Sequence, residues 1–486
     1  MIFIFEINKK DYYNLKRNLE FAFSLPGPPI LLSIVHSLQI ACSYKELIYY
    51  LETITKKYGS CTRFIFGTDI FIVLSKPEDY KLVLANANGN YKSSVTKPWD
   101  VLLGEGIIRA SGATHRIRRK MIQPLLNIKF LSEYITCFDN YSNQCADILE
   151  KVVDSPMFDL KPLLKQYAAN IFLETMMGIE GTIRNENDEL IYWQEILFKE
   201  TYNRVTKPWL QFDWIFSLTE NGRQTHIAKR IVLDFIYNIT SRKEMKHTAL
   251  ENNNENFEKP KAAFDHYLNR IQLHNVTNES CMVSDENFID DVRSFYAAIQ
   301  NTIMESISFT MLMLGMHTEV QEKLRQEISF TFGNEKVNAQ GLISMQYLHM
   351  VIQESLRLFP IAPTVSRQLT GDIKLESCTL PDGCYVLIPI FAIHRNSAYW
   401  PKPLEFIPER FSSENSSSRH RYTYIPFGTG LRDCIGQRYA FLAVATIITN
   451  LVRRFRFATS NSIEDIKLIS DIVLRSQDVK LNISHA

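Results

Sequence analysis

The stretch PFGTGLRDCIG, residues 426–436, combines one cysteine with three glycines and an arginine. A cysteine acts as a nucleophile or a metal ligand only as a thiolate, which nearby backbone N–H groups or positive charge must favour. Residues 435–450 have a helical pattern, so Cys434 is expected at a helix start, and Arg432 adds positive charge. The alternative interpretation is a glycine-rich turn that contains a buried, unreactive thiol.

Few cofactors are served by a single cysteine thiolate, and haem iron is one of them. Gly428 and Gly436 permit unusual backbone angles and a close approach of the main chain to a flat ring. Arg432 is placed to reach a haem propionate, and Phe427 can cover the sulfur and limit water. The stretch therefore predicts a haem site in which Cys434 is the axial ligand of the iron.

These residues resemble the haem-binding signature of the cytochrome P-450 superfamily, with Phe, Gly, Arg, Cys and Gly all in register. The resemblance implies a mainly α fold with small β-sheets, in which b-type haem lies between a long distal helix and a proximal loop. It implies an N-terminal segment, 1–24, followed by one catalytic domain, 25–486. The implied activity is a monooxygenase that inserts one atom of O₂ into a C–H bond of a fatty acid, hydrocarbon or xenobiotic.

Two further motifs occur in the order that the resemblance implies. Glu354-Ser-Leu-Arg357 resembles the family's ExxR element, and Arg410 belongs to a PERF element at 408–411. By resemblance, Glu354, Arg357 and Arg410 form a buried network that stabilises the haem side of the core. Burial of three charged groups is tolerable only when all are paired. Without the resemblance, a pair spaced i,i+3 would indicate little more than a solvated helix face.

The resemblance also implies cations that bind the haem propionates. Arg119 matches an arginine that follows a tryptophan by four residues in the family, and His115 occupies the tryptophan position. Both side chains could hydrogen-bond a propionate, and Arg367 matches another propionate ligand. The alternative for the basic run 116–120 is a solvated helix face.

The longest helical signal begins at Ser284, a plausible N-cap before an acidic first turn, and continues beyond His317 without a proline. The segment is mostly apolar between Phe295 and Met316, which predicts a buried helix. A helix of about 30 residues would be about 45 Å long and could cross a whole domain.

Within that helix, residues 298–302 (AIQNT) lie where the family carries its oxygen-activation pattern. Thr302 is retained, and its hydroxyl could relay a proton to the distal face of the haem. Ile299 replaces a glycine, and Asn301 replaces an acid, which removes a titratable group but can still orient water. We therefore assign Thr302 and Asn301 as candidate catalytic residues and expect weakened oxygen activation.

The wider sequence resembles the family-4 branch, whose best-known members hydroxylate fatty acids at or near the chain end. Some members bind haem covalently through a glutamate, and Ala298 occupies that position here, so the haem is expected to be bound without a covalent bond. The resemblance implies electrons from NADPH through NADPH–cytochrome P-450 reductase, docked on the Cys434 side through basic residues. Cytochrome b5 is a further partner that the resemblance allows.

The sequence also predicts the helices, strands and loops around these motifs. Residues 63–74 read as a β-hairpin, and 345–359 as a helix that carries the ExxR element. Alternating runs at 364–375 and 384–390 predict a small β region. The polar run 251–258 predicts a surface loop.

Whole-chain composition narrows the class of protein. Of the 486 residues, 45% are hydrophobic, which supports a large buried core, and the net charge of +1 gives no sign of nucleic acid binding. The eight cysteines lack a zinc or disulfide spacing, which indicates reduced thiols.

The resemblance implies the cytoplasmic face of the endoplasmic reticulum membrane. The N-terminus, however, has no run of about 18 apolar residues that would predict a spanning helix. Residues 30–35 could contact a membrane surface or pack on the domain.

Two other functions remain open from the sequence. One is a haem-thiolate protein with impaired or peroxide-rearranging chemistry, and the other is a non-catalytic haem-binding protein. Ile299 and Asn301 favour these alternatives, whereas Thr302 favours a monooxygenase.

Overall fold

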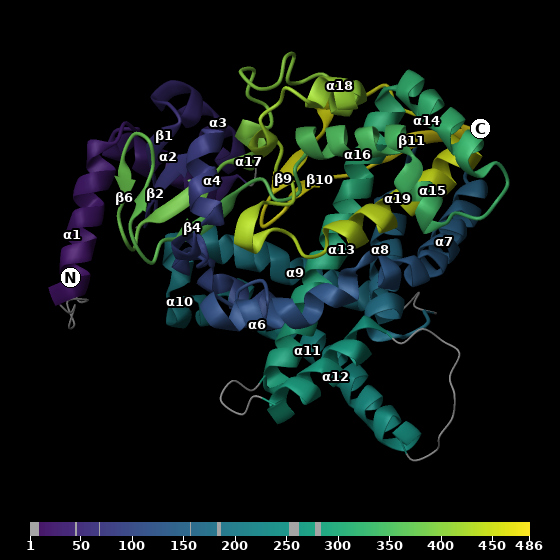
Figure 1. The fold of residues 1–486 in the computed structure, drawn as a ribbon, viewed down its shortest axis with the longest axis horizontal. Helices are drawn as coiled ribbons and strands as arrows, with labels where there is room; N and C mark the ends of the chain where they lie inside the picture. The colour runs from purple at the N-terminus through teal and green to yellow at the C-terminus, as the bar shows by residue number, and fades with distance from the viewer. Residues whose placement is uncertain are drawn as a thin grey trace.

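The long helix α13 (Asp285–Met316) runs through the middle of the molecule, and the other helices are arranged around it (Figure 1). This computed structural model describes residues 9–43, 46–67, 69–155, 157–181, 186–251, 262–277 and 283–486. The predicted N-cap of α13 is confirmed, because the Ser284 side chain accepts a hydrogen bond from the backbone N–H of Asn287. The predicted surface loop at 251–258 lies outside the described residues from 252 onward.

The remaining α-helices vary from one turn to nine turns in length. They are α1 (Lys9–Ser24), α2 (Ile30–Cys42), α3 (Glu46–Tyr58), α4 (Pro77–Ala85), α5 (Asp100–Leu103), α6 (Gly112–Ile122), α7 (Ile128–Glu150), α8 (Lys161–Met177), α9 (Glu186–Thr206), α10 (Asp213–Leu218), α11 (Glu220–Glu251), α12 (Ala263–Thr277), α14 (Thr318–Phe332), α15 (Ala339–Ser344), α16 (Gln346–Leu358), α17 (Ile390–Ile393), α18 (Ser413–Ser416) and α19 (Gln437–Arg454).

The strands form small sheets, as expected from the short alternating runs. The largest sheet has the order β1 (Cys61–Phe66), β2 (Asp69–Leu74), β7 (Tyr385–Ile388) and β4 (Val365–Gln368). In it β1 and β2 form the predicted antiparallel hairpin, and β7 runs parallel to β2. The other sheets pair β3 (Phe158–Asp159) and β8 (Phe455–Ala458) with β11 (Lys480–His485), β5 (Ile373–Lys374) with β6 (Thr379–Leu380), and β9 (Leu468–Ser470) with β10 (Leu474–Ser476).

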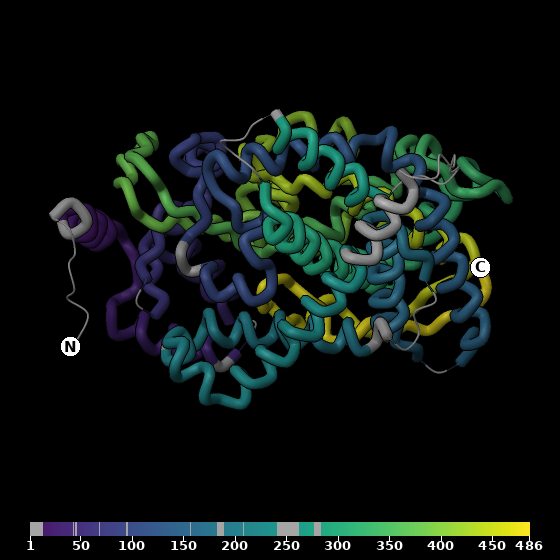
Figure 2. The backbone as a smooth tube through the Cα atoms, turned by 90° about the horizontal axis from the view of Figure 1, so that it is seen from below, coloured from purple at the N-terminus to yellow at the C-terminus, as the bar shows by residue number. Residues whose placement is uncertain are grey.

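The core is built where α13 contacts α8, α16 and α19. Buried leucine, isoleucine and phenylalanine side chains from these helices form one continuous apolar cluster. Helix α1 and the β1–β2 hairpin lie at one end of the molecule, and β8 and β11 lie toward the other (Figure 2). The mainly α fold with small β-sheets is therefore as predicted.

The start of the helix after Cys434 differs from the prediction. It begins at Gln437 rather than 435, with Gly436 as its N-cap residue, and extends to Arg454. Cys434 thus lies in the connection between the short 3₁₀-helix η8 (Gly430–Arg432) and α19.

No helix in the described ranges combines the length and apolar character needed to cross a bilayer.

Candidate functional site

The loop that carries Cys434 is held by main-chain hydrogen bonds. The N–H of Cys434 donates to the carbonyl oxygen of Phe427 at 2.8 Å, which closes the loop on itself. Gly428 and Gly430 have φ values of +67° and +79°, a region that favours glycine. A Cβ on Gly430 would also lie only 2.1 Å from the carbonyl oxygen of Leu84. By contrast, Gly436 has a φ of −89°, so an unusual backbone angle does not explain that glycine.

Cys434 is the exposed cysteine among those whose side chains the structure describes. Many protein atoms nevertheless surround this accessible side chain, and the desolvation that they cause raises the pKa of its thiol. The N–H of Gly436 and the charge of Arg119 lower the pKa, whereas the carboxylate of Asp433 raises it. Desolvation thus outweighs these two favourable contributions, so the surrounding residues alone do not favour the thiolate that the sequence led us to expect. A bound metal would supply the remaining stabilisation.

Two arginines, Arg119 of α6 and Arg432 of the loop itself, connect this loop to other segments. Arg119 of α6 donates to the carbonyl oxygen of Asp433 at 2.9 Å and to its carboxylate. Arg432 donates to the carbonyl oxygens of Ala110 at 2.5 Å and Ile108 at 3.3 Å. A guanidinium has five donors, so each arginine keeps N–H groups for a further acceptor.

His115 and Arg367 join these arginines in one cationic cluster. His115 is buried, and its burial together with the charges of Arg432, Arg119 and others lowers its pKa to about 3. Burial lowers the pKa of Arg367 to about 10. Burial and the neighbouring arginines lower the pKa of Arg432 to about 9.

Lys92 is the fifth residue of this cationic cluster, and the sequence did not predict it. Burial and the charges of Arg367 and Arg432 hold its pKa well below its usual value. No motif or periodicity marks this lysine, because it belongs to an irregular connection that only the fold brings to the cluster. Together with Arg119, these residues converge from four separated segments of the chain.

This cluster fits the propionates of haem. Within the described ranges, Asp433 is the carboxylate partner of Arg119, and Lys92, Arg367 and Arg432 form no ion pair. The buried Nε of Arg367 also lacks a hydrogen-bond partner among the described residues. Buried cations without anions are costly, so the cluster calls for an anionic ligand. Two propionates on a ring that also reaches an accessible Cys434 satisfy both requirements.

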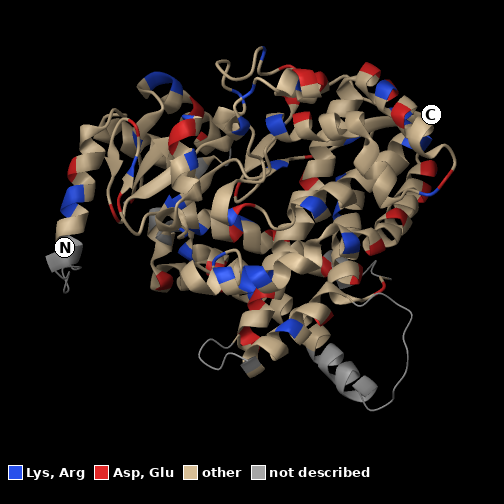
Figure 3. Cartoon of the chain, in the orientation of Figure 1, with Lys and Arg blue, Asp and Glu red and all other residues tan. Residues whose placement is uncertain are grey.

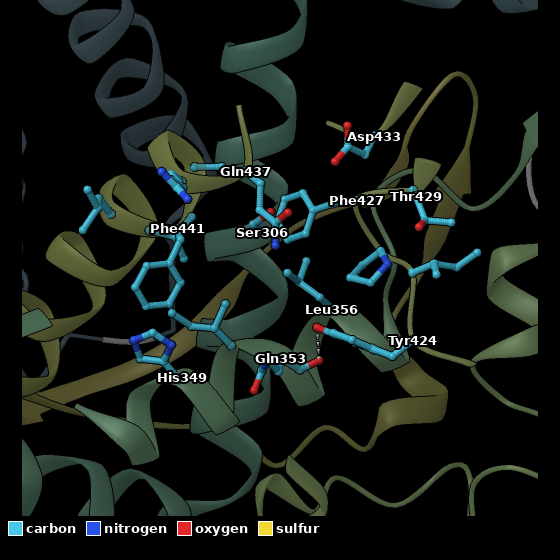
Figure 4. Close-up of a pocket in the computed structure, with 18 of the residues that line it drawn as sticks. Ser306, His349, Gln353, Leu356, Tyr424, Phe427, Thr429, Asp433, Gln437 and Phe441 are labelled. Carbon is cyan, nitrogen blue, oxygen red and sulfur yellow. Dashed lines mark hydrogen bonds between the residues drawn. The ribbon is translucent and has the colours of Figure 1, made fainter. Parts of the chain in front are cut away.

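One side of α13 is partly exposed, at two residues of an otherwise buried stretch. Every residue from Asp291 to Gly315 is buried except Ala298 and Thr302, which lie one turn apart on the same side of the helix. Ser306, one further turn along that side, lines a cavity of about 730 Å³ together with Phe427 and Gln437 (Figure 4). This side of α13 therefore comes close to the Cys434 loop at Ser306.

The hydroxyl of Thr302 donates to the carbonyl oxygen of Ala298 at 2.6 Å, so its lone pairs remain able to accept. Asn301 is buried, and its Nδ2 has no hydrogen-bond partner within the described residues. An unpaired buried amide donor is costly, and an ordered water is the natural partner for it.

Glu354, Arg357 and Arg410 meet in a separate network of buried charges. The Arg357 guanidinium donates to both carboxylate oxygens of Glu354, at 2.7 and 2.8 Å, and Arg410 donates to the same carboxylate at 3.2 Å. The remaining donors of Arg357 bind the carbonyl oxygens of His394, Pro403 and Glu405. All of the charged groups are buried and paired, as the stability of such a network requires.

Comparison with known proteins agrees with this arrangement. A family profile described as "Cytochrome P450" matches residues 25–483. The chain is 29% identical to "Cytochrome P450 4c3" of Drosophila melanogaster, over 96% of this chain and 90% of that protein. It is also 29% identical to "Cytochrome P450 4V2" of Mus musculus, over 91% of this chain and 85% of that protein. It is likewise 29% identical to "Cytochrome P450 4c21" of Blattella germanica, over 92% of this chain and 90% of that protein.

Proposed function

The chain belongs to the cytochrome P450 family, and from this premise we propose that it oxidises an apolar small molecule with a haem held through Cys434. It is an oxidoreductase of the monooxygenase class. When bound, the haem supplies thiolate-ligated iron that activates O₂ for insertion of one oxygen atom into a C–H bond. The observation that carries the proposal is the pairing of an accessible Cys434 with the partly exposed side of α13 at Thr302.

The cationic cluster would hold the propionates and so orient the ring. Arg119, Arg367 and Arg432 offer charged donors, and a neutral His115 offers one N–H. His115 and Arg119 lie on α6, Arg367 on β4 and Arg432 on η8, so the ring would be held at one edge from three separate elements. Ala298 has no carboxyl group, which supports attachment of the haem without a covalent bond.

Thr302 and Asn301 would serve the proton transfers. The Thr302 hydroxyl lies on the partly exposed side of α13, where it can accept a proton from water and pass its own proton on. The unpaired amide of Asn301 would hold that water beside Thr302. Because an amide does not titrate, this arrangement orients water without supplying an acid.

An acidic electron donor would suit the face near the Cys434 loop. Arg116 and Lys120 of α6, Lys129, Arg421 and Arg438 are exposed there. Figure 3 shows basic residues gathered along α6. Such a face favours encounter with an acidic protein, and we propose a flavoprotein reductase that draws its electrons from NADPH.

Exposed apolar side chains support attachment to a membrane surface. They occur on α2, which packs against α9, and on residues 208–218, which follow α9 and include α10. They are Ile30, Leu31, Ile34, Val35 and Leu38 on α2, Trp209 and Phe212 before α10, and Trp214 and Leu218 on α10. Exposed tryptophans and aliphatic residues in one region are typical of a surface that dips into a lipid interface. We propose the cytoplasmic face of the endoplasmic reticulum as the location.

Turnover with purified components tests the function. The haem-loaded protein would be incubated with NADPH, a cytochrome P450 reductase and lauric acid, and hydroxylated products would be identified by mass spectrometry. A reduced carbon monoxide difference spectrum on the same sample reports the thiolate ligand independently. A normal spectrum with neither NADPH oxidation nor product across fatty acids and simple hydrocarbons would contradict the proposed reaction while leaving the haem site intact.

A further inference from the structure

Residues 104–110, here called the strap, connect α5 to α6 without regular secondary structure. Main-chain groups in such a segment need partners from elsewhere. The N–H of Glu105 donates to the Asp290 carboxylate at 2.8 Å, and the N–H of Ile107 donates to the Asp291 carboxylate at 2.6 Å. Two consecutive acids of α13 therefore hold the first half of the strap.

The strap approaches α13 so closely that glycine is required. Gly104 has a φ of +57°, and a Cβ there would lie 1.9 Å from the Asp290 carboxylate. A Cβ on Gly106 would lie 2.2 Å from the hydroxyl of Ser294. Both contacts are with α13, so the first half of the strap is the part that packs tightly against this helix.

Asp291 is also the centre of a buried polar cluster. Arg118 of α6 donates to the Asp291 carboxylate at 3.3 Å and to the carbonyl oxygen of Glu105 at 2.7 Å. Tyr267 of α12 donates to Asp291 at 2.6 Å. The anchor thus joins α6, α12 and α13 to the strap.

The second half of the strap ends at the cationic cluster. Arg432 donates to the carbonyl oxygens of Ile108 and Ala110, so the strap fixes the position of this guanidinium. Two adjacent arginines of α6 bind different segments: Arg118 donates to the strap, and Arg119 donates to Asp433 in the Cys434 loop.

We propose that Asp290 and Asp291 are positioning residues that preassemble the haem site by holding the strap, and through it Arg432, in place. Neither acid belongs to the Cys434 loop or to the cationic cluster. Release of the strap from α13 frees Arg432 from its two carbonyl acceptors, which loosens one edge of the cationic cluster. The inference rests on the proposed haem site for its consequence, but the anchoring itself does not depend on bound haem.

Hydrogen exchange read by mass spectrometry tests the anchor directly, in the haem-free and the haem-loaded protein. Asp290→Ala is the first variant, because Asp290 is only partly buried and its loss leaves the Arg118 cluster intact. We expect the peptide that contains the strap to exchange on the order of 10-fold faster, as for loss of a hydrogen bond to a charged acceptor. Glu286→Ala removes an exposed acid one turn earlier on α13 and is the matched control.

The haem consequence is measured separately, as the rate of haem transfer to an excess of apomyoglobin. We expect Asp290→Ala and Asp291→Asn to release haem several-fold faster than the wild type and Glu286→Ala. Unchanged strap exchange in both aspartate variants would overturn the anchor. Faster exchange with unchanged haem release would overturn the positioning role. Failure of the wild type to bind haem would contradict the proposed function, and the exchange result would still stand.

Discussion

Arg119 of α6 and Asp433, the residue before Cys434, are joined by two hydrogen bonds, one to the main-chain carbonyl oxygen and one to the carboxylate. This pair ties the middle of a basic helix to the loop that presents the thiol. Because Asp433 pairs with Arg119, the neighbouring cations Lys92, Arg367 and Arg432 have no carboxylate partner among the described residues. The site is therefore built with an excess of positive charge, which an anionic cofactor would neutralise.

Replacement of Lys92 should affect the haem-free and haem-loaded proteins in opposite directions. Lys92→Gln removes like-charge repulsion within the cluster, which should stabilise the haem-free protein by about 1 kcal/mol. It also removes a donor to the propionates, so haem dissociation should become about 10-fold faster. Urea unfolding of the haem-free protein and haem transfer to apomyoglobin measure the two effects.

Lys97→Gln is the matched control, because Lys97 is exposed in the same connection. An unchanged rate of haem loss in Lys92→Gln would show that Lys92 does not serve the propionates.

Loss of either partner in the Glu354–Arg357 pair should prevent accumulation of haem-loaded protein. The Glu354 carboxylate accepts from Arg357, Arg410 and the N–H of Ile407, and all of these groups are buried or nearly so. Glu354→Ala leaves two buried guanidinium groups without an acid, which should cost about 3–5 kcal/mol of the free energy of unfolding. The haem content per mole of purified protein and the urea midpoint check this.

The control for this network is Glu405→Gln. The main-chain carbonyl of Glu405 accepts from Arg357, but its side chain pairs with exposed Lys402. Its replacement should therefore change stability by less than about 1 kcal/mol. Normal haem content in Glu354→Ala would contradict the proposed role of the network.

Local patterns predicted the parts of the site that lie on continuous elements. The Cys434 loop, α13 with its Ser284 cap, and the helix that carries Glu354 each have a signal within one short window. Residues that meet across the fold gave no such signal. Arg118, Tyr267 and Asp291 come from three helices, and nothing in their local sequence indicates that their side chains share a hydrogen-bonded cluster.

Gly436 and the N-terminal segment show other limits of the sequence. A glycine in a motif suggests an unusual backbone angle, yet Gly436 has an ordinary φ. Helix α1 was not predicted. Its Ala22 and Phe21 pack against the apolar cluster that includes Ile72 and Val386, and Arg17 forms an exposed ion pair with Asp372 of a distant turn.

Coupling of electron use to product should improve when an acid is restored at position 301. In the wild type, Asn301 offers an unpaired amide but no titratable proton. Asn301→Asp places a buried carboxyl beside Thr302, and burial raises the pKa of such a group toward the range of a useful proton donor. We expect the ratio of product to NADPH consumed to rise on the order of 10-fold, with less peroxide released.

Asn301→Leu is the control, because it fills similar space and can neither donate a proton nor orient water. It should release more peroxide than the wild type. If the wild type already converts NADPH fully into product, proton delivery does not limit it, and the expected weakness of Asn301 is wrong.

The stability of the protein should depend on pH through Asp291. Burial raises the pKa of this carboxyl to about 6, from a usual value of 3.8, although Arg118, Tyr267 and the N–H of Ile107 oppose the shift and Asp290 adds to it. The folded protein thus keeps this proton up to a higher pH than the unfolded chain does. The resulting stabilisation is complete below about pH 4 and is lost as the pH rises through about 6.

The loss corresponds to about 3 kcal/mol at most, because each pKa unit is worth about 1.4 kcal/mol. Asp291→Asn has no proton to lose, so its free energy of unfolding relative to the wild type should increase between pH 4 and pH 6.5, and urea unfolding along this series measures the difference. Asp147→Asn, at an exposed ion pair with Arg454, controls for removal of an aspartate. The two curves of unfolding free energy against pH would remain parallel if the Asp291 carboxyl did not titrate in this range. That outcome would mean that the charge of Arg118 lowers the pKa of Asp291 by more than burial raises it.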